Sequence, residues 1–176
     1  GTHIRCDGSL LKGTSVKMLA TASIGMDHID QEFCEEAGIH VSNAFGSDAN
    51  SVMNYVFSAL YGVAARKSIS LDGKTFGVIG VGSSGSKVAV MARYLGFRIL
   101  LCDPQPSAQF SADSYCSMDE LLDESDIVSL HVPLTEETRG MADASFFAKM
   151  QPGTIFINAS RGEVVDEEAL MEAIPK

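Results

Sequence analysis

The sequence has no tryptophan and is short of basic residues: 13 lysines and arginines stand against 23 aspartates and glutamates, a net charge of −10 at pH 7 over 176 residues. A protein that binds nucleic acid needs a basic surface to neutralise phosphates, and this composition provides none. Long apolar runs are missing as well, since no stretch approaches the roughly 20 residues that cross a bilayer. We therefore expect neither nucleic acid nor a membrane as a partner.

Cysteine is also scarce. The four cysteines are scattered and none forms a Cys-x-x-Cys pair, so we expect neither a disulfide framework nor a zinc site. Two of them fall inside apparent strands or helices, which favours reduced, buried thiols in a cytoplasmic protein and no bound metal. The residues are Cys6, Cys34, Cys102 and Cys116.

Glycine, in contrast, is well represented, and three glycines lie in the most informative stretch of the chain. Residues 75–81 form an apolar run with β-branched residues, as in a strand buried on both faces. The turn Gly80-Val81-Gly82-Ser83-Ser84-Gly85 follows, and then apolar residues at helical spacing that end at Gly96. A second strand over residues 97–102 ends in Asp103. This order is typical of a dinucleotide-binding βαβ unit.

Each residue of this pattern has an expected task. Gly80 permits the tight turn, Gly82 lets the backbone approach a pyrophosphate, and Gly85 lets the helix pack closely on the strand. The helix N-terminus offers unpaired N–H groups and a partial positive charge to the phosphates. Asp103, 18 residues after Gly85, can accept both hydroxyls of the adenosine ribose and would repel a 2′-phosphate. The predicted cofactor is therefore NAD and not NADP.

The spacing of the glycines also allows two other interpretations. One is a glycine-rich turn that binds nothing. The other is a P-loop, because Gly80 and Gly85 also fit the GxxxxG spacing. A P-loop continues with Lys and then Ser or Thr, whereas this chain continues with Ser86 and then Lys87, so we reject that motif.

Shorter patterns predict alternating strands and helices along the rest of the chain. They favour an α/β fold with a doubly wound parallel sheet, the Rossmann arrangement, preceded by a βαβ unit with too few strands to complete a sheet. We place the domain boundary inside a long amphipathic helix, giving domains over residues 1–62 and 63–176. The further strands are expected at residues 16–22, 39–43, 127–132 and 153–158. The further helices are expected from residue 27 or 30 to residue 36, at residues 48–66, 117–123 and 144–150, and from residue 166 onward.

Four segments carry a family resemblance: GVIGVGSSG, ILLCDP, LHVPLT and FINASRGEVVDEEAL. Together they resemble the NAD-dependent D-2-hydroxyacid dehydrogenases, and ATASIGMDHID resembles the end of that family's substrate domain. The resemblance implies an oxidoreductase with a Rossmann domain, part of a flavodoxin-like substrate domain, a small 2-hydroxy acid as substrate, and a homodimer. SIGMDHID with LLCDP looks most like the branch that oxidises 4-phosphoerythronate, with 3-phosphoglycerate or another D-2-hydroxy acid as the alternative substrate.

The same resemblance assigns site residues. Arg161 would hold the substrate carboxylate and is the expected catalytic residue, whereas His131 would be a strand-end residue beside the cofactor. The cofactor-binding residues would be Gly80, Gly82, Ser83, Ser84, Gly85, Asp103, Val132, Pro133, Thr138, Ala159 and Ser160, and the substrate-binding residues Thr2, Ser23 and Gly25.

The family's acid–base pair, a histidine and a glutamate, lies beyond the position of Lys176 in this numbering. Because the chain also begins with Gly1, we expect it to be a fragment that is inactive alone. A different class of function stays open: a module of the same fold that senses NAD and recruits partners without turnover. The sequence motifs do not separate that module from an enzyme.

Overall fold

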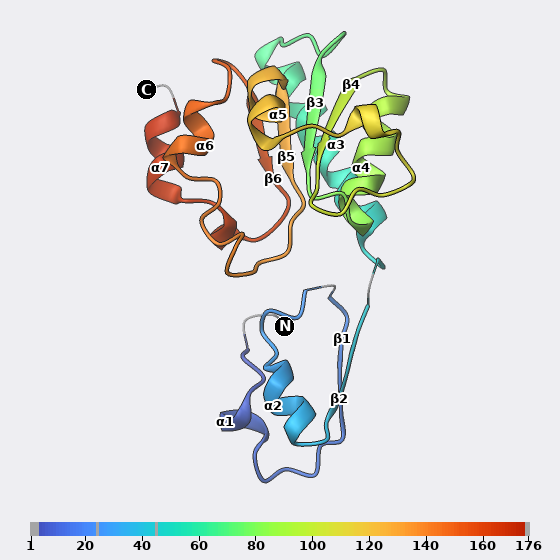
Figure 1. Cartoon of the computed structure of the whole chain (residues 1–176), viewed down its shortest axis with the longest axis vertical. Helices are drawn as coiled ribbons and strands as arrows, with labels where there is room; N and C mark the ends of the chain where they lie inside the picture. The colour runs from blue at the N-terminus through green and yellow to red at the C-terminus, as the bar shows by residue number, and fades with distance from the viewer. Residues whose placement is uncertain (1–3, 24, 45, 175–176) are drawn as a thin grey trace. The chain divides into compact units, whose positions relative to one another are not determined.

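The computed structural model describes residues 4–23, 25–44 and 46–174. It divides into two compact units, residues 1–48 and residues 49–176, which we describe separately (Figure 1). Within the described ranges, no helix combines the length and apolar character needed to cross a membrane.

The first unit is built on two parallel strands, β1 (Met18–Thr21) and β2 (His40–Asn43), which are paired along their whole length. Helix α2 (Gln31–Glu36) connects them, and helix α1 (Gly8–Leu11) precedes them. The expected βαβ unit is therefore present. Its small core consists of Leu11, Ile29, Cys34 and Ile39.

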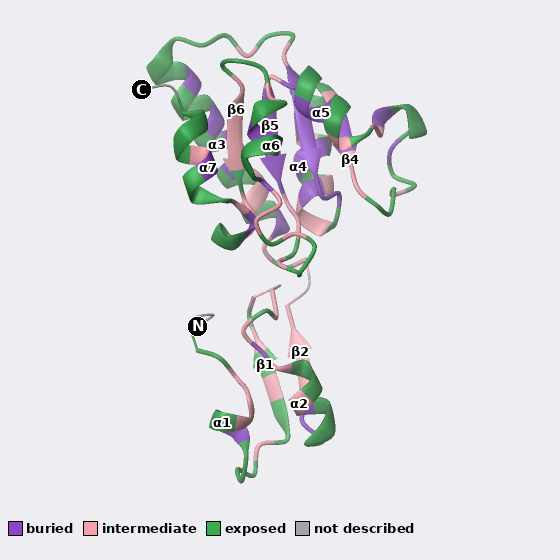
Figure 2. Ribbon diagram, turned by 60° about the vertical axis from the view of Figure 1, so that its left-hand side comes forward, coloured by how far each residue is buried: buried purple, intermediate pink, exposed green. Residues whose placement is uncertain are grey.

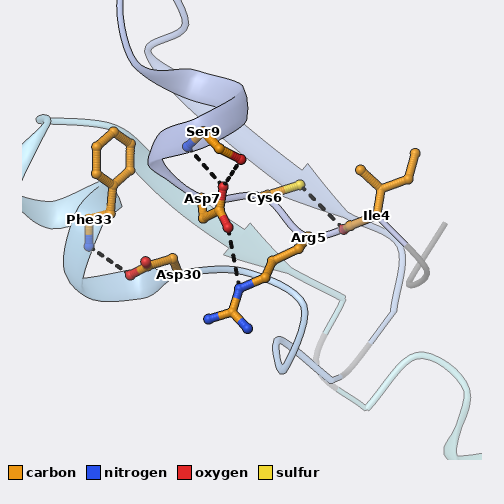
Figure 3. Close-up of polar contacts among 7 residues, drawn as sticks. All are labelled: Ile4, Arg5, Cys6, Asp7, Ser9, Asp30 and Phe33. Atoms are coloured by element: carbon orange, nitrogen blue, oxygen red, sulfur yellow. Dashed lines mark hydrogen bonds and ion pairs between the residues drawn. The ribbon is translucent and has the colours of Figure 1, made fainter.

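Two aspartates cap the helices of this unit (Figure 3). Asp30 accepts a hydrogen bond from the Phe33 N–H at 2.9 Å and so starts α2. Asp7 accepts bonds from the backbone N–H and the hydroxyl of Ser9, at 2.9 and 2.6 Å, and lies 3.4 Å from Arg5. The cap at Asp7 accounts for α1, a turn of helix in a segment for which the sequence pattern predicts nothing.

The second unit contains a four-stranded parallel sheet with the order β4-β3-β5-β6 (Figure 1). The two central strands, β3 and β5, are buried along their whole length, as Figure 2 shows for β5. Such burial on both faces matches their continuous apolar sequence. The strands are β3 (Thr75–Ile79), β4 (Arg98–Cys102), β5 (Ile127–Leu130) and β6 (Ile155–Asn158).

Helices cover both faces of this sheet. One apolar cluster joins the sheet to α3 and α4, and a second joins it to α5, α6 and α7. The predicted doubly wound α/β fold is thus confirmed. The helices are α3 (Ala49–Lys67), α4 (Ser83–Tyr94), α5 (Met118–Glu124), α6 (Ala144–Ala148) and α7 (Glu167–Ala173), with short 3₁₀ turns η1 (Ala112–Ser114) and η2 (Gly162–Val164).

The long helix α3 packs entirely within the second unit, whereas the predicted domain boundary at residues 62 and 63 cuts through it. The reason is its buried face. Val56, Phe57 and Leu60 belong to the same apolar cluster as Phe76 and Val88 of the sheet and α4. A helix so buried adds to the core of this unit along its whole length. The assignment of residues 1–62 to a substrate domain stays a prediction.

Candidate functional site

The turn after β3 can be made only by glycine at its first position. Gly80 has φ +86°, and a Cβ atom there would lie 2.7 Å from the carbonyl oxygen of His131. The Gly80 N–H donates to the Cys102 carbonyl at 2.9 Å. The turn is therefore held between the carboxyl ends of β4 and β5, the edge at which parallel α/β sheets bind ligands.

The other two glycines of the turn serve different purposes. Gly85 is buried in the first turn of α4, and a Cβ atom there would overlap the carbonyl oxygen of Gly80. Gly82 is exposed, and a Cβ atom there would meet nothing within 4 Å. Gly85 is thus required for packing, whereas Gly82 leaves open space above the backbone.

That open space lies at the N-terminus of α4. Gly82 is the N-cap residue, and no side chain caps the helix. The first N–H groups of a helix have no partner within it and carry a partial positive charge, so they attract an anion. Ser83 and Ser84, in the first turn, are half-buried. The residues therefore fit a pyrophosphate.

Asp103 is held beside the same turn. Its Oδ2 accepts a hydrogen bond from the Val81 N–H at 2.6 Å, and its Oδ1 accepts one from the Gln105 N–H at 2.7 Å. A carboxylate oxygen can accept more than one hydrogen bond, so both oxygens retain capacity for ribose hydroxyls. The fixed negative charge disfavours a 2′-phosphate.

The segments that follow β5 and β6 lie next to each other. The Val132 N–H donates to the Ser160 hydroxyl at 2.9 Å, and the Ala159 N–H donates to the Leu130 carbonyl at 3.1 Å. The Thr138 hydroxyl donates to the Pro133 carbonyl at 2.6 Å. Five of the residues predicted to bind the cofactor are thus brought together at this edge of the sheet.

Arg161 follows directly and is half-buried. Asn158, at the end of β6, brackets its loop: the side-chain amide donates to the Arg161 carbonyl at 2.8 Å, and its oxygen accepts from the Ser160 N–H at 2.9 Å. Arg161 Nη1 lies 3.4 Å from the Ser160 carbonyl. The sequence pattern gave Asn158 no role beyond ending a strand. Because asparagine side chains often bond to backbone groups a few residues away, an Asn three residues before Arg161 could have indicated this role.

His131 lies between the glycine turn and these loops. Burial lowers its pKa to about 4, so the ring is neutral near pH 7. Its Nε2 is 2.9 Å from the Ser129 hydroxyl. A histidine with so low a pKa is a poor general acid near neutrality.

In the first unit, Ser23 and Gly25 share the turn after β1. The Ser23 hydroxyl donates to the Gly25 carbonyl at 3.0 Å and is 2.8 Å from the Thr21 hydroxyl. Thr2, the third predicted substrate residue, lies outside the described residues. Across the described ranges, no group of three or more His, Cys, Asp or Glu side chains could hold a metal ion.

Residues 51–176 match the family described as the NAD-binding domain of the D-isomer specific 2-hydroxyacid dehydrogenases. The chain belongs to this family. The unit that carries the glycine turn is thus an NAD-binding domain, as predicted, and the open backbone at Gly82 and the carboxylate of Asp103 fit that cofactor.

Among curated relatives in this family, the erythronate-4-phosphate dehydrogenase of Bacteroides fragilis is 42% identical over 98% of this chain and 51% of its own length. That of Chromohalobacter salexigens is also 42% identical, over 98% of this chain and 46% of its own length. The chain therefore spans about half the length of these relatives.

Two solved structures are similar across both parts of the chain. The D-lactate dehydrogenase of Aquifex aeolicus, complexed with NAD and lactic acid, is 33% identical with a TM-score of 0.82, over 96% of this chain and 57% of that one. The NAD⁺-bound 3-phosphoglycerate dehydrogenase of Entamoeba histolytica is 30% identical with a TM-score of 0.84, over the same shares. The Rossmann-like fold predicted from the sequence agrees with these neighbours.

Proposed function

We propose that this chain is part of an NAD-dependent oxidoreductase that transfers a hydride between a phosphorylated 2-hydroxy acid and NAD, with 4-phosphoerythronate as the substrate. The names of the relatives at 42% identity support this substrate. The same relationship supports a place in pyridoxine biosynthesis. A cytoplasmic location is supported by the four cysteines, all of which are free thiols.

The observation that carries the proposal is the open backbone of Gly82 at the start of α4, with Asp103 bonded to the adjoining Val81. In the proposed complex, residues 82–85 hold the pyrophosphate, Asp103 holds the adenosine ribose, and Val132, Pro133, Thr138, Ala159 and Ser160 line the remainder of the cofactor. When bound, NAD supplies the acceptor of the hydride.

Arg161 is proposed to clamp the substrate carboxylate. A guanidinium can donate two parallel hydrogen bonds to a carboxylate, which fixes both the position and the orientation of the acid. The same charge would polarise the carbonyl form of the substrate. The two bonds from Asn158 to the loop hold the backbone on either side of the Ser160–Arg161 peptide, which favours a fixed starting point for this long side chain. Ser23, Gly25 and Thr2 are proposed to contact substrate from the first unit.

The proposal is tested by turnover of the gene product that contains this chain, with NAD and either 4-phosphoerythronate or 3-phosphoglycerate. We expect Arg161→Ala to lower kcat/KM by about 100-fold or more, since a charge-assisted bidentate contact to the reacting acid is lost. Arg139→Ala, at an exposed arginine of a neighbouring loop, is the matched control and should keep full activity. Unchanged turnover in Arg161→Ala would remove Arg161 from the mechanism.

The same assay distinguishes two candidate substrates. The structural neighbour from Entamoeba histolytica makes 3-phosphoglycerate the second candidate. A higher kcat/KM for 3-phosphoglycerate than for 4-phosphoerythronate would show that 3-phosphoglycerate is the better substrate and would contradict our proposal. NAD binding without turnover of any 2-hydroxy acid would point instead to a module that senses NAD.

We further propose a homodimer formed through α3. Of its 19 residues only the last two, Arg66 and Lys67, are charged, although most of its outer face is exposed. Tyr55, Tyr61 and Val63 are among the exposed apolar residues. A helix face with so little charge is unusual in a chain of net charge −10, and such faces are characteristic of protein interfaces. An antiparallel second copy would also place opposite helix ends together.

A further inference from the structure

The short segment 104–107, which follows β4, lies largely in solvent. Three of its four residues are exposed, and Ser107 is half-buried. Pro104 and Pro106 have no backbone N–H, so the segment has only two main-chain donors, at Gln105 and Ser107. With so little buried surface, its conformation depends on the groups to which these two donors bond.

Both donors have partners. The Gln105 N–H donates to Oδ1 of Asp103 at 2.7 Å, and the Ser107 N–H donates to the hydroxyl oxygen of Tyr115 at 2.9 Å. The first bond turns the chain back onto the carboxylate of the candidate site. The second bond ties the other end of the segment to a side chain eight positions later. The segment is therefore held at one end by Asp103 and at the other by Tyr115.

Tyr115 is a fixed point for this contact. Its main chain forms a parallel bridge with Leu101 of β4, and the next residue, Cys116, donates to the Leu101 carbonyl at 3.0 Å. Its side chain packs against the apolar cluster that contains Leu101 and Val88. Because the sheet holds the backbone and the core holds the ring, the hydroxyl is kept at a defined place beside Ser107.

The later part of the same loop has an attachment of its own. Phe110 is buried, and the guanidinium carbon of Arg93, in the last turn of α4, lies 5.3 Å from the centre of its ring. Arg93 also donates to the Ser114 hydroxyl at 3.3 Å. Loss of the Tyr115 hydroxyl would therefore loosen residues 104–107 without releasing the rest of the loop.

The Asp103 carboxylate is oriented from two sides. Oδ2 is bonded to the Val81 N–H in the glycine turn, and Oδ1 is bonded to Gln105. One bond on each oxygen fixes the plane of the carboxylate, and a group that must accept hydroxyls of one sugar gains affinity from being fixed in advance. The bond to Gln105 depends in turn on the segment that Tyr115 holds.

We propose that Tyr115 is a positioning residue for Asp103: its hydroxyl holds segment 104–107, and this segment orients the carboxylate for the 2′-hydroxyl of the adenosine ribose. Tyr115 thus contributes to cofactor selectivity without touching the cofactor. This inference rests on the proposed function, which assigns the ribose to Asp103.

The chain of hydrogen bonds is tested first, without cofactor, by NMR measurement of amide exchange with water. Tyr115→Phe keeps the ring and removes only the hydroxyl. We expect amide exchange to become about 10-fold faster at Ser107 and about 5-fold faster at Gln105, and to stay within about 2-fold at Val81, whose partner Oδ2 is on the side of the glycine turn. Unchanged exchange at Gln105 would overturn the proposal.

The effect on selectivity is tested by calorimetric titration with NAD and with 2′-deoxy-NAD, whose adenosine ribose lacks the 2′-hydroxyl. We expect the wild-type chain to bind NAD about 10-fold more tightly than the deoxy compound. Tyr115→Phe should weaken NAD binding about 5-fold and leave the deoxy compound within about 2-fold, because only NAD uses the oriented carboxylate fully. Tyr94→Phe, at a tyrosine of α4 that is 85% exposed, is the matched control and should keep the wild-type preference.

The outcomes separate the two proposals. A wild-type chain that binds no NAD, or that binds both compounds equally well, would refute the proposed contact of Asp103 with the ribose and this inference with it. A wild type that prefers NAD, with the same preference in Tyr115→Phe or a parallel loss of both compounds, would refute the positioning role alone. A reduced preference in Tyr115→Phe, with the control unchanged, would support it.

Discussion

At the scale of single residues, three glycines in one turn meet three separate physical demands. Gly80 needs a positive φ and a close approach to His131, Gly85 needs the space beside the Gly80 carbonyl, and Gly82 needs neither. Among the described residues no contact requires glycine at position 82, and the bare backbone there fits a bound ligand. Stability and binding should therefore respond differently to the same substitution at these positions.

We expect Gly82→Val to fold normally and to lose NAD affinity by about 100-fold or more, because its side chain would fill the open space above the α4 N-terminus. Gly85→Val should instead destabilise the fold by roughly 4 kcal/mol or more, since the side chain has no room. Gly62→Val, at an open position of α3, is the matched control for binding. Thermal unfolding and NAD titration measure both effects, and equal NAD affinity in Gly82→Val and wild type would contradict the site.

At the scale of one element, α3 has two faces with different partners. Its buried face, with Val56 and Leu60, belongs to the core of the NAD-binding unit. Its outer face is exposed yet carries charge only at the C-terminal end, and Tyr55 is 73% exposed. An ordinary amphipathic surface helix places charged residues on its solvent side. The outer face therefore resembles an interface more than a solvated surface.

We expect the protein to be a dimer and Tyr55→Glu to make it a monomer, because a buried, unpaired carboxylate is costly in an apolar interface. Met171→Glu on α7 changes a comparably exposed apolar residue, 69% exposed, on the other face of the sheet. It should leave the dimer intact. Sedimentation equilibrium at micromolar concentration reports the mass directly, and a wild-type monomer would exclude this interface.

At the scale of the whole molecule, the described residues proposed to bind NAD all lie in residues 49–176, whereas Ser23 and Gly25 lie in the first unit. Each unit has its own apolar cluster or clusters. Cofactor binding and substrate contact are thus assigned to separate compact units. This division suggests that the two properties can be separated experimentally.

We expect residues 49–176, produced alone, to fold cooperatively and to bind NAD within about 3-fold of the affinity of the 176-residue chain. The full helix α3 must be included because its buried face completes the core. A version that starts at residue 63 should be unstable for the same reason. Circular dichroism and NAD titration compare the two, and a stable product from residue 63 would favour the boundary drawn from the sequence.

The local features of this protein could be predicted from its amino-acid sequence alone. The apolar periodicity and the glycine turn each depend on a few neighbouring residues, and the expected strands and helices are present. In the structure, Asp30, Ser117, Asp143 and Asp166 cap four of these helices. The family followed from the same local motifs.

Contacts between residues far apart in the sequence depend on the fold of the whole chain and could not be predicted from local patterns. The bond from Val81 to Asp103 spans 22 residues, and that from Val132 to Ser160 spans 28. Ser129 and His131 are two residues apart in the sequence, so their contact is local. The burial of Ser129, however, depends on β3 and β6, which come from elsewhere in the chain. Helix α3 belongs to the second unit because its apolar face packs against the sheet. The free energy of that packing depends on the apolar area that is buried and not on position in the sequence.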